Sequence, residues 1–156
     1  MPRIPILCFL AAALALASCG PHYNGYMTRP YAIRGVRYEP LAPRAALGFR
    51  ERGLASWYDE RTFLWWGGKT SLGEKFRAGA MAGAHKTLPL PCRIRVTNLA
   101  NGRSADVRLN DRGPFVSNRI LDLTPGAAKR LGFKKQGLAP VDIRVLSVGD
   151  GRWRIR

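Results

Sequence analysis

The segment 84–115 constrains the fold most, because two short strand-like runs in it lie between breaks in regular structure. Apolar and polar residues alternate over 92–97 and again over 105–109, with the two-residue period of a strand that buries one face. The pair Asn101-Gly102 between the runs is typical of a tight hairpin turn. We therefore predict a β-hairpin in this segment.

One short helix and further strands are predicted after the hairpin. Thr124 is a candidate N-cap, Pro125 stands at the first helical position, and Gly132 marks the helix end. Residues 141–145 alternate apolar and charged side chains, and G-D-G at 149–151 would turn the chain into W-R-I-R. Many short strands with one helix predict a small, mainly β barrel or sandwich.

The motif N-D-R-G-P-F places a carboxylate at the end of the second predicted strand. Asp111 follows that strand and precedes Gly113 and Pro114, which stop a strand from continuing. We therefore expect its carboxylate where a polymer can reach it. The alternative is that Asp111 caps the following turn through a side-chain hydrogen bond.

The N-terminal residues predict an export signal. Arg3 supplies positive charge, and 4–17 is almost wholly apolar but too short to span a bilayer comfortably. The L-A-S-C that ends at Cys19 resembles a bacterial lipoprotein cleavage and acylation site, and the Gly20 that follows resembles a signal for transfer to the outer membrane. An ordinary secretory signal that happens to contain a cysteine is the alternative.

The cysteines and histidines predict neither a disulfide nor a metal site. Of the 3 cysteines, Cys8 would leave with the signal and Cys19 would carry lipid, so that Cys92 alone remains. Cys92 begins an alternating run, and we expect it to be a small buried core residue. His22 and His85 stand apart, and no C-x-x-C or H-x-x-x-H spacing occurs, so we expect no metal and no cofactor.

The formal net charge of +16 implies an anionic partner. Nucleic acid would be the default for a cytosolic protein this basic, but an exported lipoprotein meets other polyanions first. We therefore expect no nucleic-acid partner. General adhesion to anionic lipid or lipopolysaccharide is the alternative use of this charge.

Four segments in order resemble the rare lipoprotein A family of cell-wall lytic transglycosylases. They are G-L-A-S-W-Y from Gly53, L-G-E from Leu72, A-H-K-T-L-P from Ala84, and N-D-R-G-P-F. The resemblance covers about 53–133 and implies a six-stranded double-psi β-barrel with one or two short helices.

The expected domain organisation follows from the export signal and the resemblance together. We expect a lipoprotein signal over 1–18, a lipidated tether and approach segment over 19–50, and the barrel over 51–156. Many family members append a repeat-containing glycan-binding domain after the barrel. Because the sequence ends at Arg156, we expect no such domain here.

The activity implied by the resemblance is cleavage of peptidoglycan glycan strands to 1,6-anhydro-muramic acid ends. Cleavage requires a proton on the leaving oxygen, and we expect Asp111 to supply it. By resemblance, Glu74 and His85 would stabilise the developing positive charge or tune the acid. Asp122 is expected to brace the helix start and is the reserve acid. The alternatives are a solvated turn position for Glu74 and a hydrogen-bonded brace for His85.

Substrate binding is expected from aromatic faces on which sugar rings stack, together with polar side chains nearby. Core packing is the alternative for Trp57. The expected residues are Trp57, Tyr58, Trp65, Trp66, Thr70 and Arg112.

The expected partners are peptidoglycan strands and a membrane reached through the lipid anchor, with the protein acting as a monomer. Strands without stem peptides expose a carboxylate on every muramic acid, so the basic chain should prefer them. One rival function is a non-catalytic wall-binding module similar to expansins, and another is a lipoprotein that tethers the envelope to the wall by charge.

Overall fold

The computed structural model describes residues 27–59, 68–149 and 153–154. The elements in chain order are β1 (Tyr31–Ile33), β2 (Val36–Tyr38), β3 (Arg50–Trp57), β4 (Ala82–His85), β5 (Cys92–Asn98), β6 (Ser104–Asp111), β7 (Arg119–Leu123), α1 (Pro125–Arg130), β8 (Leu138–Val148) and β9 (Trp153–Arg154). In the part of the chain described, no helix is long and apolar enough to cross a membrane.

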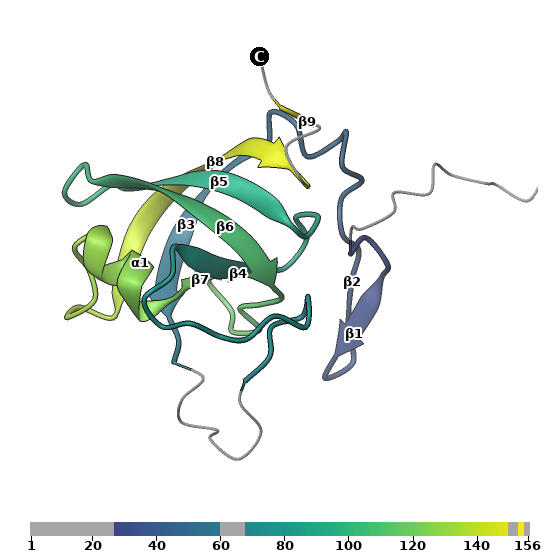
Figure 1. Cartoon of the computed structure of the whole chain (residues 1–156), viewed down its shortest axis with the longest axis horizontal. Coiled ribbons are helices and arrows are strands. Elements are labelled where there is room, and N and C mark those ends of the chain that lie inside the picture. The colour runs from purple at the N-terminus through teal and green to yellow at the C-terminus, as the bar shows by residue number, and fades with distance from the viewer. Residues whose placement is uncertain (1–26, 60–67, 150–152, 155–156) are drawn as a thin grey trace, which may run out of the picture.

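Six of the described strands form a closed ring. Their order is β3-β7-β4-β6-β5-β8, and β3 pairs with β8 to close it, while β9 extends β8 at one edge (Figure 1). The pairs β3–β7 and β4–β6 are parallel, whereas β5 pairs with both β6 and β8 antiparallel. The expected six-stranded double-psi β-barrel is confirmed.

The predicted hairpin is the β5–β6 pair, and its alternation decides which side chains fill the barrel. Cys92, Ile94 and Val96 are fully buried, and so are Ile143 and Val145 on the adjacent β8. Burial raises the pKa of the Cys92 thiol to about 12, so the thiol stays protonated at neutral pH. Cys92 is therefore the small core residue that the sequence predicted.

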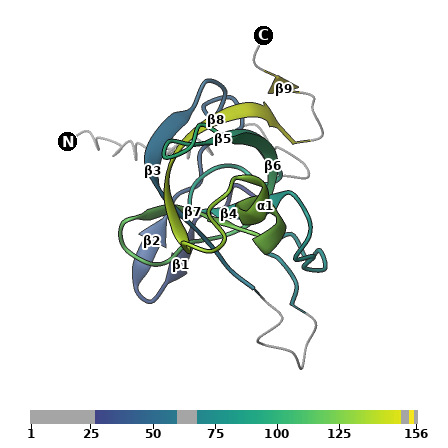
Figure 2. The ribbon, with the colours of Figure 1, turned by 90° about the vertical axis from the view of Figure 1, so that its left-hand side faces the viewer.

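The predicted helix is also confirmed. The Thr124 side chain accepts a hydrogen bond from the Ala127 amide, Pro125 opens α1, and Gly132 follows the last turn with a φ of +79°. Figure 1 places α1 and the β1–β2 hairpin on opposite sides of the barrel, and in Figure 2, turned by 90°, the side that carries α1 faces the viewer.

Residues 27–50, which the sequence assigned to a tether and approach segment, pack on the barrel. The Met27 amide donates to the Leu90 carbonyl at 2.8 Å, and the Leu41 amide donates to the Thr87 carbonyl at 2.7 Å. Ala46 is fully buried in the core. The packed unit therefore includes more of the chain than the boundary at residue 51 implied.

We predict that a version of the protein starting at Glu51 is less stable than one starting at Met27. It loses fully buried Ala46 and the partly buried Leu41, Leu47 and Phe49. At about 1.5–3 kcal/mol for each fully buried large apolar side chain, the loss should be at least about 2 kcal/mol. Urea denaturation monitored by circular dichroism measures it. Equal midpoints and slopes would show that residues 27–50 do not stabilise the barrel.

Candidate active site

Asp111 ends β6, as predicted, and its carboxylate is held by donors from three segments. Oδ1 accepts from the Ser71 amide at 2.9 Å, from the Ser71 hydroxyl at 2.5 Å, and from the Arg112 amide at 2.8 Å. Oδ2 accepts from the Tyr58 hydroxyl at 3.2 Å. These bonds fix the orientation of the carboxylate at the strand end, beside a cavity of about 790 Å³ that Asp111 lines.

Glu74 lies on the neighbouring loop and forms a two-pronged ion pair with β6. Its oxygens accept from both terminal nitrogens of Arg108, each at 2.7 Å, and from the Asn110 amide group at 2.9 Å. The Arg108 guanidinium, with help from Asn110, holds the Glu74 pKa below its usual range. Glu74 is therefore an ionised carboxylate at neutral pH and is half exposed, with 40% of its side-chain surface accessible.

Glu74 and Asp111 face adjoining cavities. Glu74, Tyr58 and Asn110 line a cavity of about 340 Å³, and Thr70 lines both this cavity and the one at Asp111. Tyr58 connects the two cavities, because it lines the first and its hydroxyl donates a hydrogen bond to Asp111, which lines the second.

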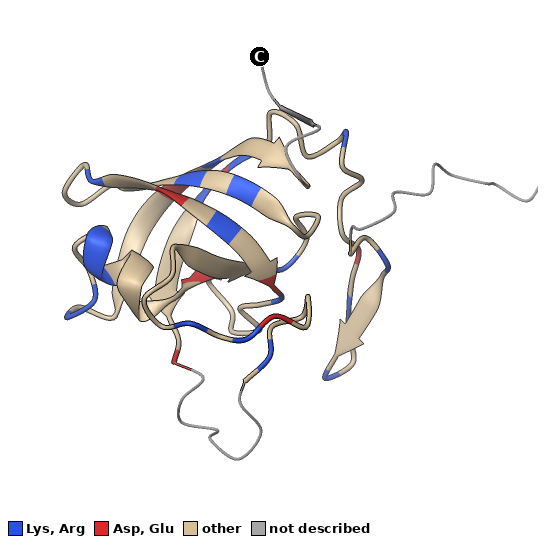
Figure 3. Ribbon diagram, in the orientation of Figure 1, with Lys and Arg blue, Asp and Glu red and all other residues tan. Residues whose placement is uncertain are grey.

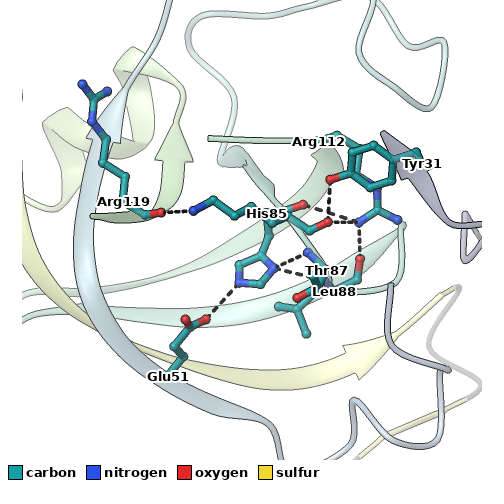
Figure 4. A network of polar contacts seen from close by, with 8 residues as sticks. Tyr31, Glu51, His85, Thr87, Leu88, Arg112 and Arg119 are labelled. Atoms are coloured by element: carbon teal, nitrogen blue, oxygen red, sulfur yellow. Dashed lines mark hydrogen bonds and ion pairs between the residues drawn. The ribbon is translucent and has the colours of Figure 1, made fainter. Parts of the chain in front are cut away.

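His85 is almost fully buried, with 3% of its surface exposed, and both ring nitrogens are bonded (Figure 4). Nδ1 accepts from the Thr87 and Leu88 amides at 3.1 and 3.0 Å, and Nε2 lies 3.1 Å from Glu51 Oε2. Because Nδ1 accepts two N–H groups, the proton is on Nε2 and points to Glu51. This geometry is that of the hydrogen-bonded brace, the alternative considered for His85, and a direct catalytic role stays a prediction.

Arg112, expected to bind substrate, lines the cavity at Asp111 and also clamps backbone carbonyls. Nη1 donates to the Leu88 carbonyl at 2.6 Å and to the Lys86 carbonyl at 3.3 Å (Figure 4). Nη2 donates to the Met27 carbonyl. The guanidinium also lies 5.4 Å from the centre of the Tyr31 ring. Arg112 thus joins the loop after β4 to the N-terminal segment, next to Asp111.

The other expected binding residues separate into different settings. Trp57 donates from Nε1 to the Lys134 carbonyl at 3.0 Å and packs partly against the core, which is the core-packing alternative. Tyr58 and Thr70 line the cavities described above. Trp65 and Trp66 lie outside the described residues, as does Cys19.

Asp122 does not brace the helix start, because the side chain that caps α1 is that of Thr124. Its carboxylate accepts from the Ser56 hydroxyl, and burial raises its pKa above the usual range although that hydrogen bond opposes the shift. Ala84 of β4 pairs with Asp122 of β7 on one side and with Asp111 of β6 on the other. Asp122 is not among the residues that line either cavity.

Three partners of the site were missed by sequence reasoning. Ser71 donates two hydrogen bonds to Asp111. It lies just before L-G-E, and its hydroxyl close to the expected carboxylate Glu74 was the signal that could have identified it. Glu51 stood at the expected start of the barrel without a role, although R-E-R-G-L-A-S-W forms one strand, β3. Arg108 and Asn110 are two residues apart on β6, so the two-residue period of a strand could have predicted that they share a face.

Among the described residues, no group of three or more histidine, cysteine, aspartate or glutamate side chains is arranged to hold a metal ion.

Comparison with known proteins assigns the fold and these segments to a family. The family model described as lytic transglycolase matches residues 50–143. The chain therefore belongs to the lytic transglycolase family of double-psi β-barrel domains.

Among sequence relatives, the endolytic peptidoglycan transglycosylase RlpA of Rickettsia bellii is 46% identical over 136 residues, which cover 84% of this chain and 59% of that protein. The protein of the same name from Neisseria meningitidis serogroup B is 48% identical over 122 residues, which cover 78% of this chain and 49% of the relative. The chain thus spans about half the length of these curated relatives.

Among solved structures, Streptomyces papain inhibitor matches with a TM-score of 0.50 at 18% identity, covering 64% of this chain and 96% of that one. At this identity the match shows a shared fold and carries no functional argument.

If His85 is a brace, removing its ring should lower stability. We predict that His85→Ala leaves two backbone amides unpaired and lowers the unfolding free energy by about 1–3 kcal/mol for each buried amide left without a partner. His85→Asn is the matched control, because its carbonyl can accept from an amide two residues on and should restore part of the loss. Thermal denaturation measures both variants. An unchanged melting temperature together with lost activity would instead assign His85 to catalysis.

Proposed function

We propose that this protein is an endolytic lytic transglycosylase that cleaves peptidoglycan glycan strands and leaves 1,6-anhydro-muramic acid ends. The observation that carries the proposal is the pair of carboxylates on adjoining cavities, Asp111 at the end of β6 and Glu74 on the loop beside it. Membership of the lytic transglycolase family and the names of the relatives support the same activity.

In the proposed reaction, Asp111 donates its proton to the glycosidic oxygen as the bond from that oxygen to C1 of muramic acid breaks. The C6 hydroxyl of the same muramic acid then attacks C1 and forms the anhydro bond. Its proton passes to the Asp111 carboxylate, which restores the acid, and no water is consumed.

Glu74 is suited to stabilise the positive charge that develops on the sugar, because Arg108 and Asn110 keep it ionised. Asp122 has the raised pKa that suits an acid, but it does not line the cavities, so Asp111 remains the first choice. His85 would act indirectly, by holding the loop after β4 against which Arg112 is clamped.

The rival function is a wall-binding module without cleavage. Basic residues lie on β5 and α1 (Figure 3), and the formal net charge is +16, so the protein would also suit adhesion to a polyanion. The orientation of Asp111 by four donated hydrogen bonds favours the enzyme, because adhesion alone does not require a positioned carboxylate.

The product test separates the two functions. We predict that the protein releases fragments with 1,6-anhydro-muramic ends from glycan strands stripped of stem peptides, as measured by mass spectrometry. Asp111→Asn should reduce the rate at least about 100-fold, the usual contribution of a general acid, with binding to the strands nearly unchanged. Asp122→Asn is the control and should keep most of the activity. Reducing ends alone would indicate a hydrolase, and an active Asp111→Asn variant would move the acid to Asp122 or Glu74.

We further propose that Cys19 carries a lipid that anchors the protein in a periplasm-facing membrane, the outer membrane being indicated by Gly20. Each buried acyl methylene contributes about 0.8 kcal/mol, so several chains would hold the protein stably. We expect Cys19→Ala to abolish labelling by a palmitate analogue and to move the protein from the membrane to the soluble fraction. Persistent labelling of that variant would refute the anchor.

A further inference from the structure

The N-terminal hairpin forms one wall of the cavity at Asp111. The cavity of about 790 Å³ is lined from the N-terminal segment by Arg29, Tyr31 and Ile33, and from the barrel by Lys69, Asp111 and Phe115, among others. Sequence patterns predicted no role for this segment beyond connecting the anchor to the barrel. The carboxylate at the end of β6 therefore faces a surface that the barrel strands alone do not supply.

The wall is held in place by contacts with the barrel. The Tyr31 hydroxyl donates to the Lys86 carbonyl at 2.7 Å, and its ring stacks on Tyr38 with centres 5.2 Å apart. The rings of Tyr31 and Phe115, which lies four residues after Asp111, pack edge-on with their centres 6.2 Å apart. The Arg112 guanidinium lies over the Tyr31 ring (Figure 4). Because these contacts reach the segments on both sides of the site, the position of the hairpin is coupled to that of Asp111.

The rim of this cavity is cationic. Arg29 comes from the N-terminal segment and Lys69 from the barrel, and both are exposed. Within the described part of the chain, neither forms an ion pair. Arg112 cannot replace them, because its terminal nitrogens are bonded to backbone carbonyls. Two unpaired cations beside aromatic rings suit a ligand that carries a carboxylate next to a ring with an apolar C–H face.

We propose that the N-terminal segment is a substrate-binding wall, in which Arg29 and Lys69 bind the carboxylate of an acidic sugar while Tyr31 and Phe115 contact its ring. This inference rests on the proposed function, because it assigns the acidic sugar of the glycan strand to this cavity. It gives a structural reason for preferring muramic acid whose carboxylate is free, since an amide-linked stem peptide removes the charge that the rim would bind.

The test compares two double variants that lose the same charge. Arg29→Gln/Lys69→Gln removes the rim cations, whereas Arg93→Gln/Arg144→Gln removes two exposed cations from β5 and β8 that do not line the cavity. The probe is a short glycan oligosaccharide without stem peptides, and its carboxyl-reduced form, with alcohols in place of carboxylates, is the ligand control. Binding is measured by calorimetry in the Asp111→Asn background, which keeps the probe intact, and circular dichroism verifies folding.

We expect the rim variant to bind the oligosaccharide about tenfold more weakly and the β5–β8 variant to bind it within about twofold of the parent. The parent should bind the carboxyl-reduced ligand more weakly than the oligosaccharide by a similar factor. The rim variant should bind the two ligands equally. In the wild-type background the rim substitutions should raise KM and leave kcat nearly unchanged.

Equal weakening by both double variants would overturn the inference in favour of general charge attraction, and unchanged binding by the rim variant would overturn it outright. Failure of the proposed function looks different. Carboxylate-dependent binding at the rim without any cleavage by the wild-type protein would refute the transglycosylase and leave the wall in place. Cleavage that is insensitive to Arg29 and Lys69 would refute the wall alone.

Discussion

Closure of the barrel by β3 is the constraint on which the rest of the structure depends. This strand pairs parallel with β7 on one side and antiparallel with β8 on the other, over Arg50–Trp57. Without that second pairing the six strands would form an open sheet with two edges. Closure also fixes the parallel β4–β6 pair, whose carboxyl ends, at His85 and Asp111, then lie at the same rim. The site is therefore a product of the barrel topology.

The carboxylates near this rim differ in what surrounds them, and the difference assigns their chemistry. Glu74 is kept ionised by Arg108, so it suits the stabilisation of positive charge. Asp122 has its pKa raised by burial beneath the rim. Asp111 is the one of the three that lines the larger cavity, and donors from two flanking segments orient it. Accessibility and orientation, more than acidity, decide which carboxylate is placed to meet a polymer.

Arg112 connects the site to the N-terminal segment. Its guanidinium binds carbonyls of the loop after β4 and of Met27, and its cost of burial is offset by charge-assisted hydrogen bonds. Tyr31 adds a second link through the Lys86 carbonyl. The segment expected to connect an anchor to the barrel therefore forms part of the cavity at Asp111.

The sequence by itself determined the local structure of this protein. Alternation over β5, the Asn101-Gly102 turn and the Thr124-Pro125 helix start were readable because each depends on neighbouring residues. The position of Asp111 at a strand end was readable for the same reason, since Gly113 and Pro114 follow it directly.

Only the tertiary structure decided which residues meet across the barrel. His85 and Glu51 lie 34 positions apart, and Tyr31 and Lys86 lie 55 apart, so no local pattern could predict their hydrogen bonds. The same applies to Arg112, whose carbonyl partners come from the loop after β4 and from Met27. Side-chain roles depend on contacts made by strand pairing and barrel closure, and these are set by the packing of the whole chain.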